Sequence, residues 1–217
     1  MHFSTGRLTK SQAATLTRWR SRLLDDRPLP GTPRKPPSLR FLGIDNRPPA
    51  SCSDAIAALT EALIRHPPSG LDIARYVDRA ITAQKLAGQG NLGPHAPILN
   101  PVSFYLTADT ADRCLALLST SYQAVLQVHQ QLNEQARTTF PNRNQAQERR
   151  IFVLEELARR RVPVRPYRPT NGVLARMAID RAARRSVDRV LIEAVDYAQR
   201  VHDQPHRARR DMHVLDR

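Results

Sequence analysis

The clearest pattern of apolar and polar residues lies in the middle of the chain, between residues 102 and 135. Val102, Phe104 and Leu106 alternate with polar side chains, which predicts a half-buried strand over 102–107. After Thr107, which is suited to cap a helix, apolar residues recur at alternating steps of four and three, which predicts a long helix with a heptad face. The residues of this face are Ala111, Leu115, Leu118, Tyr122, Val125, His129 and Leu132.

A heptad face of this length is stable in water only when another helix covers it. We expect the cover to come from a second copy of the chain, so the sequence predicts a homo-oligomer held together through residues 111–132. The alternative is an intramolecular partner, in which case the protein is a particle of 24.5 kDa.

Helical periodicity recurs on both sides of this central stretch. In the first of these helices, capped by Thr9 or Ser11, Trp19 lies on the apolar face and is expected in the core rather than as a stacking platform. The second helix is expected to begin at the cap Ser53, and Ser69 is expected to open the third. The predicted helices span residues 9–26, 53–65, 71–87 and 144–161. Residues 170–203 are predicted as two helices, or as one with a weak joint at Arg185–Ser186, where Ser186 is suited to cap the second half.

In the helix predicted over 144–161, three apolar residues are expected to face inward. These are Ile151, Leu154 and Leu157, at the spacing that places side chains on one side of a helix. We therefore expect this helix to pack on the rest of the protein through all three.

Prolines mark the segments in which regular structure is not expected. Residues 27–49 contain seven prolines among basic residues, and residues 162–170 contain three, so both are expected to be extended. The predicted fold is mainly α, a helical bundle with one short strand near 102–107 and extended proline-rich basic segments. Its predicted parts are a basic N-terminal helix over 1–26, a linker or arm over 27–52, a helical core domain over 53–204 and a mobile basic tail over 205–217.

The formal net charge of +14 is unevenly distributed along the chain. Ten basic and three acidic side chains give residues 1–52 a net charge of +7, and nineteen basic and ten acidic ones give residues 137–217 a net charge of +9. Between them, residues 53–136 carry five basic and seven acidic side chains, a net charge of −2. Two basic ends around a near-neutral middle indicate contact surfaces on a core.

The basic residues are almost all arginines, because only positions 10, 35 and 85 are lysine. The guanidinium group binds a phosphate through two parallel hydrogen bonds, so this bias favours nucleic acid as a partner. A coding sequence rich in G and C would explain the same bias equally well.

The two cysteines, Cys52 and Cys114, lie far apart without the spacing of a metal or redox pair. We therefore expect free thiols in a reducing compartment. The first residues lack the apolar run of a signal peptide, and no apolar stretch has the length of a membrane span. The sequence predicts a soluble, cytoplasmic protein.

Two stretches resemble parts of the ribbon-helix-helix family of dimeric DNA-binding proteins. Residues 102–118, VSFYLTADTADRCLALL, are similar to that family's strand, turn and first helix, and residues 174–198 to its pair of helices. The resemblance implies that the backbone amide at Ser186 binds a phosphate. It also implies a ribbon made with a second subunit, whose groove-facing residues are Ser103, Tyr105 and Thr107.

The sequence contains no motif that predicts catalysis, a metal or a cofactor. The acidic residues nearly all have an arginine within four positions, which indicates ion pairs on helix surfaces rather than acid–base chemistry. His202 and His206 have the spacing of two metal ligands on a helix, with His213 as a candidate third, but Pro205 lies between them and no Cys or acidic ligand frames them. We therefore expect a non-enzymatic protein without metal or cofactor.

These observations together predict a DNA-binding protein, a transcriptional regulator or a maintenance factor of a mobile element, with DNA favoured over RNA. The alternative is a scaffolding protein whose basic arms hold a protein partner or an assembled particle. Arginines are expected to contact phosphate in two clusters. The first cluster is Arg149, Arg150, Arg159, Arg160, Arg161, Arg165 and Arg168, and the second is Arg181, Arg184, Arg185 and Arg189.

Overall fold

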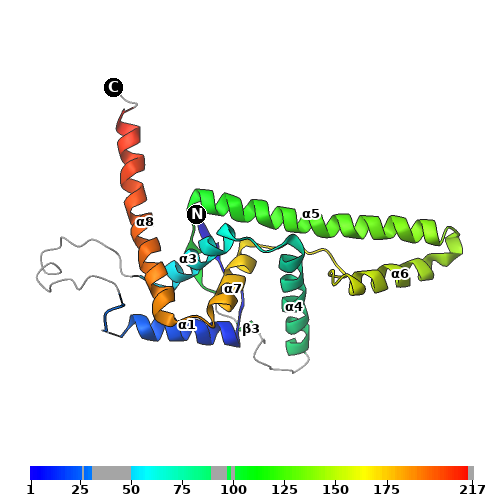
Figure 1. Ribbon diagram of the computed structural model, residues 1–217, viewed down its shortest axis with the longest axis horizontal. Coiled ribbons are helices and arrows are strands. Elements are labelled where there is room, and N and C mark those ends of the chain that lie inside the picture. The colour runs from blue at the N-terminus through cyan, green and yellow to red at the C-terminus, as the bar shows by residue number, and fades with distance from the viewer. Residues whose placement is uncertain (26, 31–49, 89–96, 99–100, 215–217) are drawn as a thin grey trace, which may run out of the picture.

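The computed structural model describes residues 1–25, 27–30, 50–88, 97–98 and 101–214, and they form a mainly helical protein (Figure 1). The predicted fold class is therefore confirmed, whereas most of the proline-rich arm expected over 27–52 lies outside the described residues. The helices are α1 (Lys10–Leu23), α3 (Cys52–Arg65), α4 (Gly70–Gly88), α5 (Ala108–Thr139), α6 (Ala146–Arg159), α7 (Asn171–Ala182) and α8 (Val187–Val214), with a 3-10 turn, η1 (Arg143–Gln145), before α6.

The strand predicted near 102–107 is present as β4 (Ser103–Tyr105). It pairs antiparallel with β1 (His2–Ser4), and a second short pair joins β2 (Leu8–Thr9) to β3 (Pro97–Ile98). The expected alternation is confirmed, because Phe104 and Leu106 are buried while Ser103 and Tyr105 are exposed. The strand thus finds its partner in the N-terminus of the same chain.

Side-chain caps fix where several helices begin. Thr9 caps α1, and the hydroxyl of Thr107 accepts a hydrogen bond at the start of α5, both as expected. The cap expected at Ser53 is wrong. Helix α3 is capped by Ser51, whose hydroxyl accepts from the amide of Asp54 while the Asp54 carboxylate accepts from the amide of Ser51.

The main hydrophobic core lies between α1, α3, α7, α8 and the first half of α5. Trp19 of α1 is fully buried there and contributes to the same core as Ile56, Leu174 and Leu191, which confirms that it is a core residue. The Tyr197 hydroxyl of α8 donates a hydrogen bond to the backbone carbonyl of Tyr105 at 2.7 Å. The N-terminal helix therefore shares one core with the helices of residues 53–204.

The second half of α5 forms a hairpin with α6, which folds back along it away from the main core (Figure 1). A smaller hydrophobic cluster joins Val125 and Leu132 of α5 to Leu157 and Val162, and Leu71 of α4 packs against it. Most of the heptad face of α5 is therefore covered by other parts of the same chain. A second copy was expected because this face needed a cover, and that reason is wrong for most of the face. Leu115 is the exception, with 52% of its surface exposed.

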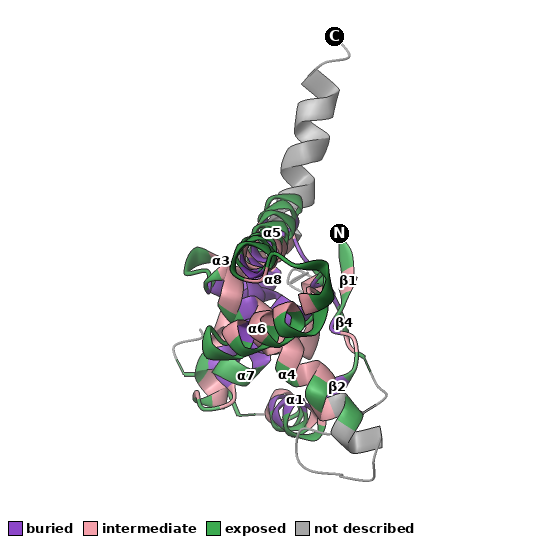
Figure 2. Ribbon diagram, turned by 90° about the vertical axis from the view of Figure 1, so that its right-hand side faces the viewer, coloured by how far each residue is buried: buried purple, intermediate pink, exposed green. Residues whose placement is uncertain are grey.

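The three apolar residues expected to face inward from α6 have different environments. Leu157 is buried against α5 as expected, but the expectation is wrong for Ile151, which is 46% exposed, and for Leu154, which is 37% exposed. Figure 2 shows α6 as a ribbon of mostly exposed and intermediate residues. Helix α5 is the main neighbour of α6. It covers only part of the apolar side of α6.

Helix α8 continues further than expected. Its last residue is Val214, so residues 205–214 of the segment expected as a mobile tail are helical. Across the described part of the chain, no helix combines the length and the apolar character that crossing a membrane requires.

The first turn of α7 lies against the residues that follow β1. A Cβ atom at Gly172 would come within 2.7 Å of the backbone carbonyl oxygens of Ser4 and Thr5, so only glycine fits without a shift of backbone. Arg176 of α7 also donates a hydrogen bond to the Thr5 carbonyl at 2.6 Å. These contacts place α7 between the N-terminal segment and the main core.

Candidate functional site

The arginines predicted to contact phosphate divide into two groups by their interactions. One group is held by the protein itself and consists of Arg149, Arg159, Arg160 and Arg185. The guanidinium groups of the other make no hydrogen bond or ion pair with any residue that the structure describes. These are Arg150, Arg161, Arg165, Arg168, Arg181, Arg184 and Arg189.

Arg149 has a structural role at the tip of the hairpin. Its Nε donates to the carbonyl of Phe140 at 2.7 Å and its Nη2 to the carbonyl of Asn142 at 2.5 Å. These carbonyls belong to the turn between α5 and α6, and that of Asn142 also accepts a hydrogen bond from the amide of Gln145 in η1. The guanidinium of Arg149 therefore holds the turn closed and is not available for a phosphate.

Arg159 and Arg160, in the last turn of α6, share one carboxylate. The Nη2 of Arg159 lies 2.7 Å and the Nε of Arg160 lies 3.3 Å from Oε2 of Glu156. The hydrogen bond from Arg159 holds the pKa of Glu156 below its usual value. The carboxylate is therefore charged at neutral pH and neutralises part of the charge of both arginines.

This shared carboxylate leads to a prediction for Glu156→Gln. The substitution releases Arg159 and Arg160, so we expect the affinity for duplex DNA to rise by about fivefold at low salt. Glu155→Gln is the matched control, because Glu155 is exposed, has no partner among the described residues and changes the net charge equally. Fluorescence anisotropy measures both, and an equal rise in the two variants would show that the released arginines do not reach the DNA.

The segment between α6 and α7 carries three of the unpaired arginines. It is held against α4 by a hydrogen bond of 3.0 Å from Nε of Arg75 to the carbonyl of Arg161, and against α5 by a 2.9 Å contact between Nε2 of His129 and the carbonyl of Pro163. Here the three exposed side chains of Arg161, Arg165 and Arg168 are called the connector arginines.

Arg161 adopts a backbone conformation that normally belongs to glycine. Its φ is 54°, and its amide donates to the carbonyl of Ala158 while the amide of Val162 donates to that of Leu157. This is the Schellman ending of a helix, in which the left-handed residue is usually glycine because a Cβ atom is strained there. An arginine at this position costs stability, which favours a use for its guanidinium group.

Replacing Arg161 by glycine is expected to raise the stability of the protein and to lower its affinity for DNA. Relief of the left-handed strain raises the free energy of unfolding by about 1 kcal/mol. Loss of one phosphate contact lowers DNA affinity by about eightfold near 100 mM salt. In Arg161→Ala the affinity falls equally without the gain in stability. Denaturant unfolding and anisotropy measure the two effects, and unchanged affinity in both variants would exclude Arg161 from the interface.

A second group of arginines surrounds the turn between α7 and α8. Helix α1 packs on this turn, because Nη2 of Arg18 donates to the carbonyl of Ala183 at 3.4 Å. No local sequence pattern predicts this contact, because the two residues lie 165 positions apart. Here the exposed side chains of Arg18, Arg181, Arg184 and Arg189 are called the junction patch.

The acidic residues near the junction patch have partners of their own. Asp188 pairs with Arg22 at 2.5 Å, and Glu193 pairs with Arg185. The carboxylate of Asp180 accepts hydrogen bonds from Tyr76 at 2.7 Å and from Gln12 at 3.0 Å. Burial and the nearby Asp180 charge raise the pKa of the Tyr76 hydroxyl, which stays protonated. No carboxylate is therefore paired with Arg181, Arg184 or Arg189 among the described residues.

Helix α7 relates the two groups of arginines to each other. The connector arginines precede its first residue and Arg184 and Arg189 follow its last, and its 12 residues span roughly 18 Å. A length of roughly 18 Å corresponds to about five base pairs of duplex DNA. Helix α8 begins directly after Ser186, and the unpaired amides of a helix's first turn favour an anion.

In the part of the chain that the structure describes, the cysteines do not indicate a nucleophile and the acidic residues and histidines do not form a metal site. Burial raises the pKa of the Cys114 thiol to about 11 and also raises that of Cys52, so neither thiol is activated as a nucleophile. No group of three or more potential metal ligands occurs within the described ranges. For His202 and His206 the structure describes the helical backbone but not the side chains, so this pair lies outside the search for metal ligands.

The stretches that resemble ribbon-helix-helix proteins can be located in the fold. Ser103 and Tyr105 are exposed on the β1–β4 pair, whereas Thr107 is occupied as the cap of α5. Residues 174–198 lie in α7 and in α8, on either side of Ser186. A comparison of the chain with protein-family models, with curated proteins and with solved structures found no match.

Proposed function

We propose that this protein binds nucleic acid, with duplex DNA preferred, through the connector arginines and the junction patch. The observation that carries the proposal is that the connector arginines and Arg181, Arg184 and Arg189 lack partners among the described residues, while the carboxylates near the junction patch are engaged elsewhere. Unpaired guanidinium groups keep their full charge and their hydrogen-bond donors for an external phosphate.

The distribution of the unpaired arginines favours a polyanion over a single small anion as the ligand. The arginines are exposed and lie before, within and after α7, a helix that itself spans roughly 18 Å. Arg165 lines a cavity of only about 10 Å³, and the others line none of the described cavities, so each would contact a different phosphate of an extended backbone. Contacts of this kind fix the position of the backbone and give affinity that depends steeply on salt.

The preference for DNA over RNA rests on the resemblance to ribbon-helix-helix proteins. A regulator or a maintenance factor of a mobile element, without catalytic activity and located in the cytoplasm, remains the proposed role. Self-association also remains a prediction, although most of the heptad face of α5 no longer requires it. Light scattering distinguishes a 24.5 kDa particle from a larger one.

Binding to three labelled probes tests the proposal. We expect anisotropy titrations at 50 mM salt to give the tightest binding to a 20-base-pair DNA duplex and weaker binding to an RNA duplex of the same sequence. A polyglutamate of similar charge tests whether charge alone suffices, and it should bind least because it lacks the phosphates that guanidinium groups fit. Equal affinity for all three probes, or no binding to DNA, would contradict the proposal.

A further inference from the structure

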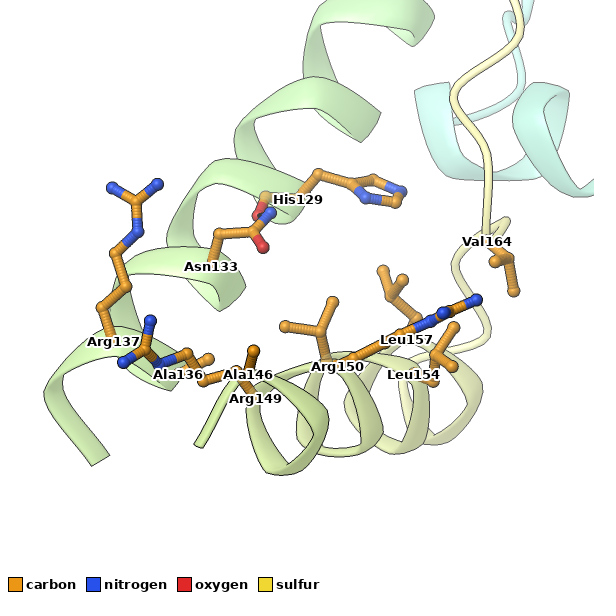
Figure 3. Close-up of a pocket in the computed structure, with 11 residues that line it drawn as sticks. His129, Asn133, Ala136, Arg137, Ala146, Arg149, Arg150, Leu154, Leu157 and Val164 are labelled. Atoms are coloured by element: carbon orange, nitrogen blue, oxygen red, sulfur yellow. Dashed lines mark hydrogen bonds between the residues drawn. The ribbon is translucent and has the colours of Figure 1, made fainter. Parts of the chain in front are cut away.

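A groove runs between the second half of α5 and α6, and Val164 at one end of it belongs to the segment that carries the connector arginines. It has a volume of about 350 Å³ and lies open between the two helices. In Figure 3, Arg137 and Arg149 lie at one end of the groove, while Leu154 and Val164 lie at the other. The groove is thus long and has different chemistry along its length.

The floor of the groove is apolar and incompletely covered. Leu157 is buried against α5, but Leu154 on the same helix is 37% exposed, and Val164 just beyond α6 is 56% exposed. Val153 and Ala136 also line it. Leaving such apolar side chains in water is unfavourable, so the groove favours a ligand with an apolar face.

The rim of the groove is basic. Arg137, Arg149 and Arg150 line it together with His129 and Asn133, and no aspartate or glutamate is among its lining residues. Arg149 is held by the turn carbonyls, but Arg137 and Arg150 have no partners in the described part of the chain. Glu148 and Glu155, also on α6, do not line the groove. A ligand that also carries negative charge would therefore be favoured.

We propose that the groove binds an amphipathic, acidic α-helix of a partner protein. A helix places apolar residues at intervals of three and four along one side, which suits a long apolar floor, and its flanking carboxylates would pair with Arg137 and Arg150. None of the connector arginines and no arginine of the junction patch lines the groove, and the proposal does not depend on DNA binding.

The other possible occupants fit less well. A second copy of the chain carries a net charge of +14 and would bring positive charge to a positive rim. The chain's own segment 31–49 has four basic residues and one acidic residue, so it is not acidic either. A single strand of nucleic acid would need aromatic rings for its bases, and none of the lining residues is Phe, Tyr or Trp.

Three designed peptides test the proposal by fluorescence anisotropy on the full chain. The first is an 18-residue helix with leucines on one side and glutamates on the other, the second replaces the leucines by serine, and the third replaces the glutamates by lysine. We expect the first peptide to bind at least tenfold more tightly than either of the others. If the first peptide fails to bind below about 1 mM, or if the serine peptide binds equally well, the groove is not the proposed site.

Substitutions locate the binding. Leu154→Asp and Arg150→Glu should each weaken binding of the acidic peptide by at least tenfold, whereas the controls Leu115→Asp and Arg79→Glu, at exposed positions outside the groove, should change it by less than about threefold. Because Leu154 is partly exposed, circular dichroism should show a folded variant, and its DNA affinity should be retained. Displacement of the peptide by duplex DNA would assign the groove to nucleic acid and overturn the proposal.

Discussion

Replacing Arg181, Arg184 and Arg189 by glutamine lowers the affinity for duplex DNA by about 500-fold near 100 mM salt. The three side chains are exposed, without partners among the described residues and close together at the turn between α7 and α8. Each phosphate contact that is lost also removes about one unit from the slope of log affinity against log salt. The variant should therefore show a slope smaller by about three.

The matched control for this variant removes the same charge elsewhere. Arg7, Arg79 and Arg113 are exposed and lie outside the junction patch and the connector. Their joint replacement by glutamine should lower the affinity only a few-fold, through the change in net charge. If the two triple variants lose affinity equally, the arginines act through the overall charge of the protein and the junction patch is not an interface.

Trp19→Ala is expected to lower the free energy of unfolding by about 3–5 kcal/mol. The side chain is fully buried, and removing it leaves a cavity between α1 and the helices of the main core. Since α1 also carries Arg18 of the junction patch, the same change should loosen the patch. Urea denaturation followed by circular dichroism measures the loss of stability.

Leu24→Ala is the control for Trp19→Ala, because Leu24 is among the exposed apolar residues and follows the same helix. Its effect on the free energy of unfolding should stay within about 0.5 kcal/mol. If Trp19→Ala left the stability unchanged and removed DNA binding instead, Trp19 would be a stacking platform for a base and not a core residue.

The parts of the fold that depend on local patterns could be predicted from the sequence. The alternation around Phe104 and the apolar faces of the helices have short periods, so a single stretch of chain contains the whole signal. Trp19 was correctly placed in the core for this reason. Caps are less certain, since Ser51 and Ser53 both lie near the start of α3 and only the reciprocal hydrogen bonds with Asp54 identify the first as the cap.

The parts that depend on distant contacts could not be predicted. The heptad face of α5 indicated that a partner was needed, but not that α4 and α6 of the same chain supply it. The apolar residues of α6 likewise indicated a buried side, yet α5 covers Leu157 and leaves Ile151 partly exposed. In the candidate site, the contact of Arg18 with Ala183 joins two segments that no periodicity connects.

Which arginines are available for a ligand also required the structure. Arg159 and Arg165 belong to the same basic stretch, but the first is paired with Glu156 one turn away and the second has no partner among the described residues. The i to i+3 spacing of that pair was visible in the sequence. The hydrogen bonds of Arg149 to the carbonyls of the hairpin turn were not, because they depend on how α6 folds back.

The central claim is that unpaired arginines at the two ends of α7 hold the phosphates of duplex DNA. Its most direct test is the affinity of the unmodified chain for a 20-base-pair duplex at 50 and at 200 mM salt. Contact of the connector arginines and of Arg181, Arg184 and Arg189 with phosphate predicts a loss of about 1,000-fold between these two concentrations. No binding at 50 mM salt, or a loss of less than about tenfold, would contradict the claim.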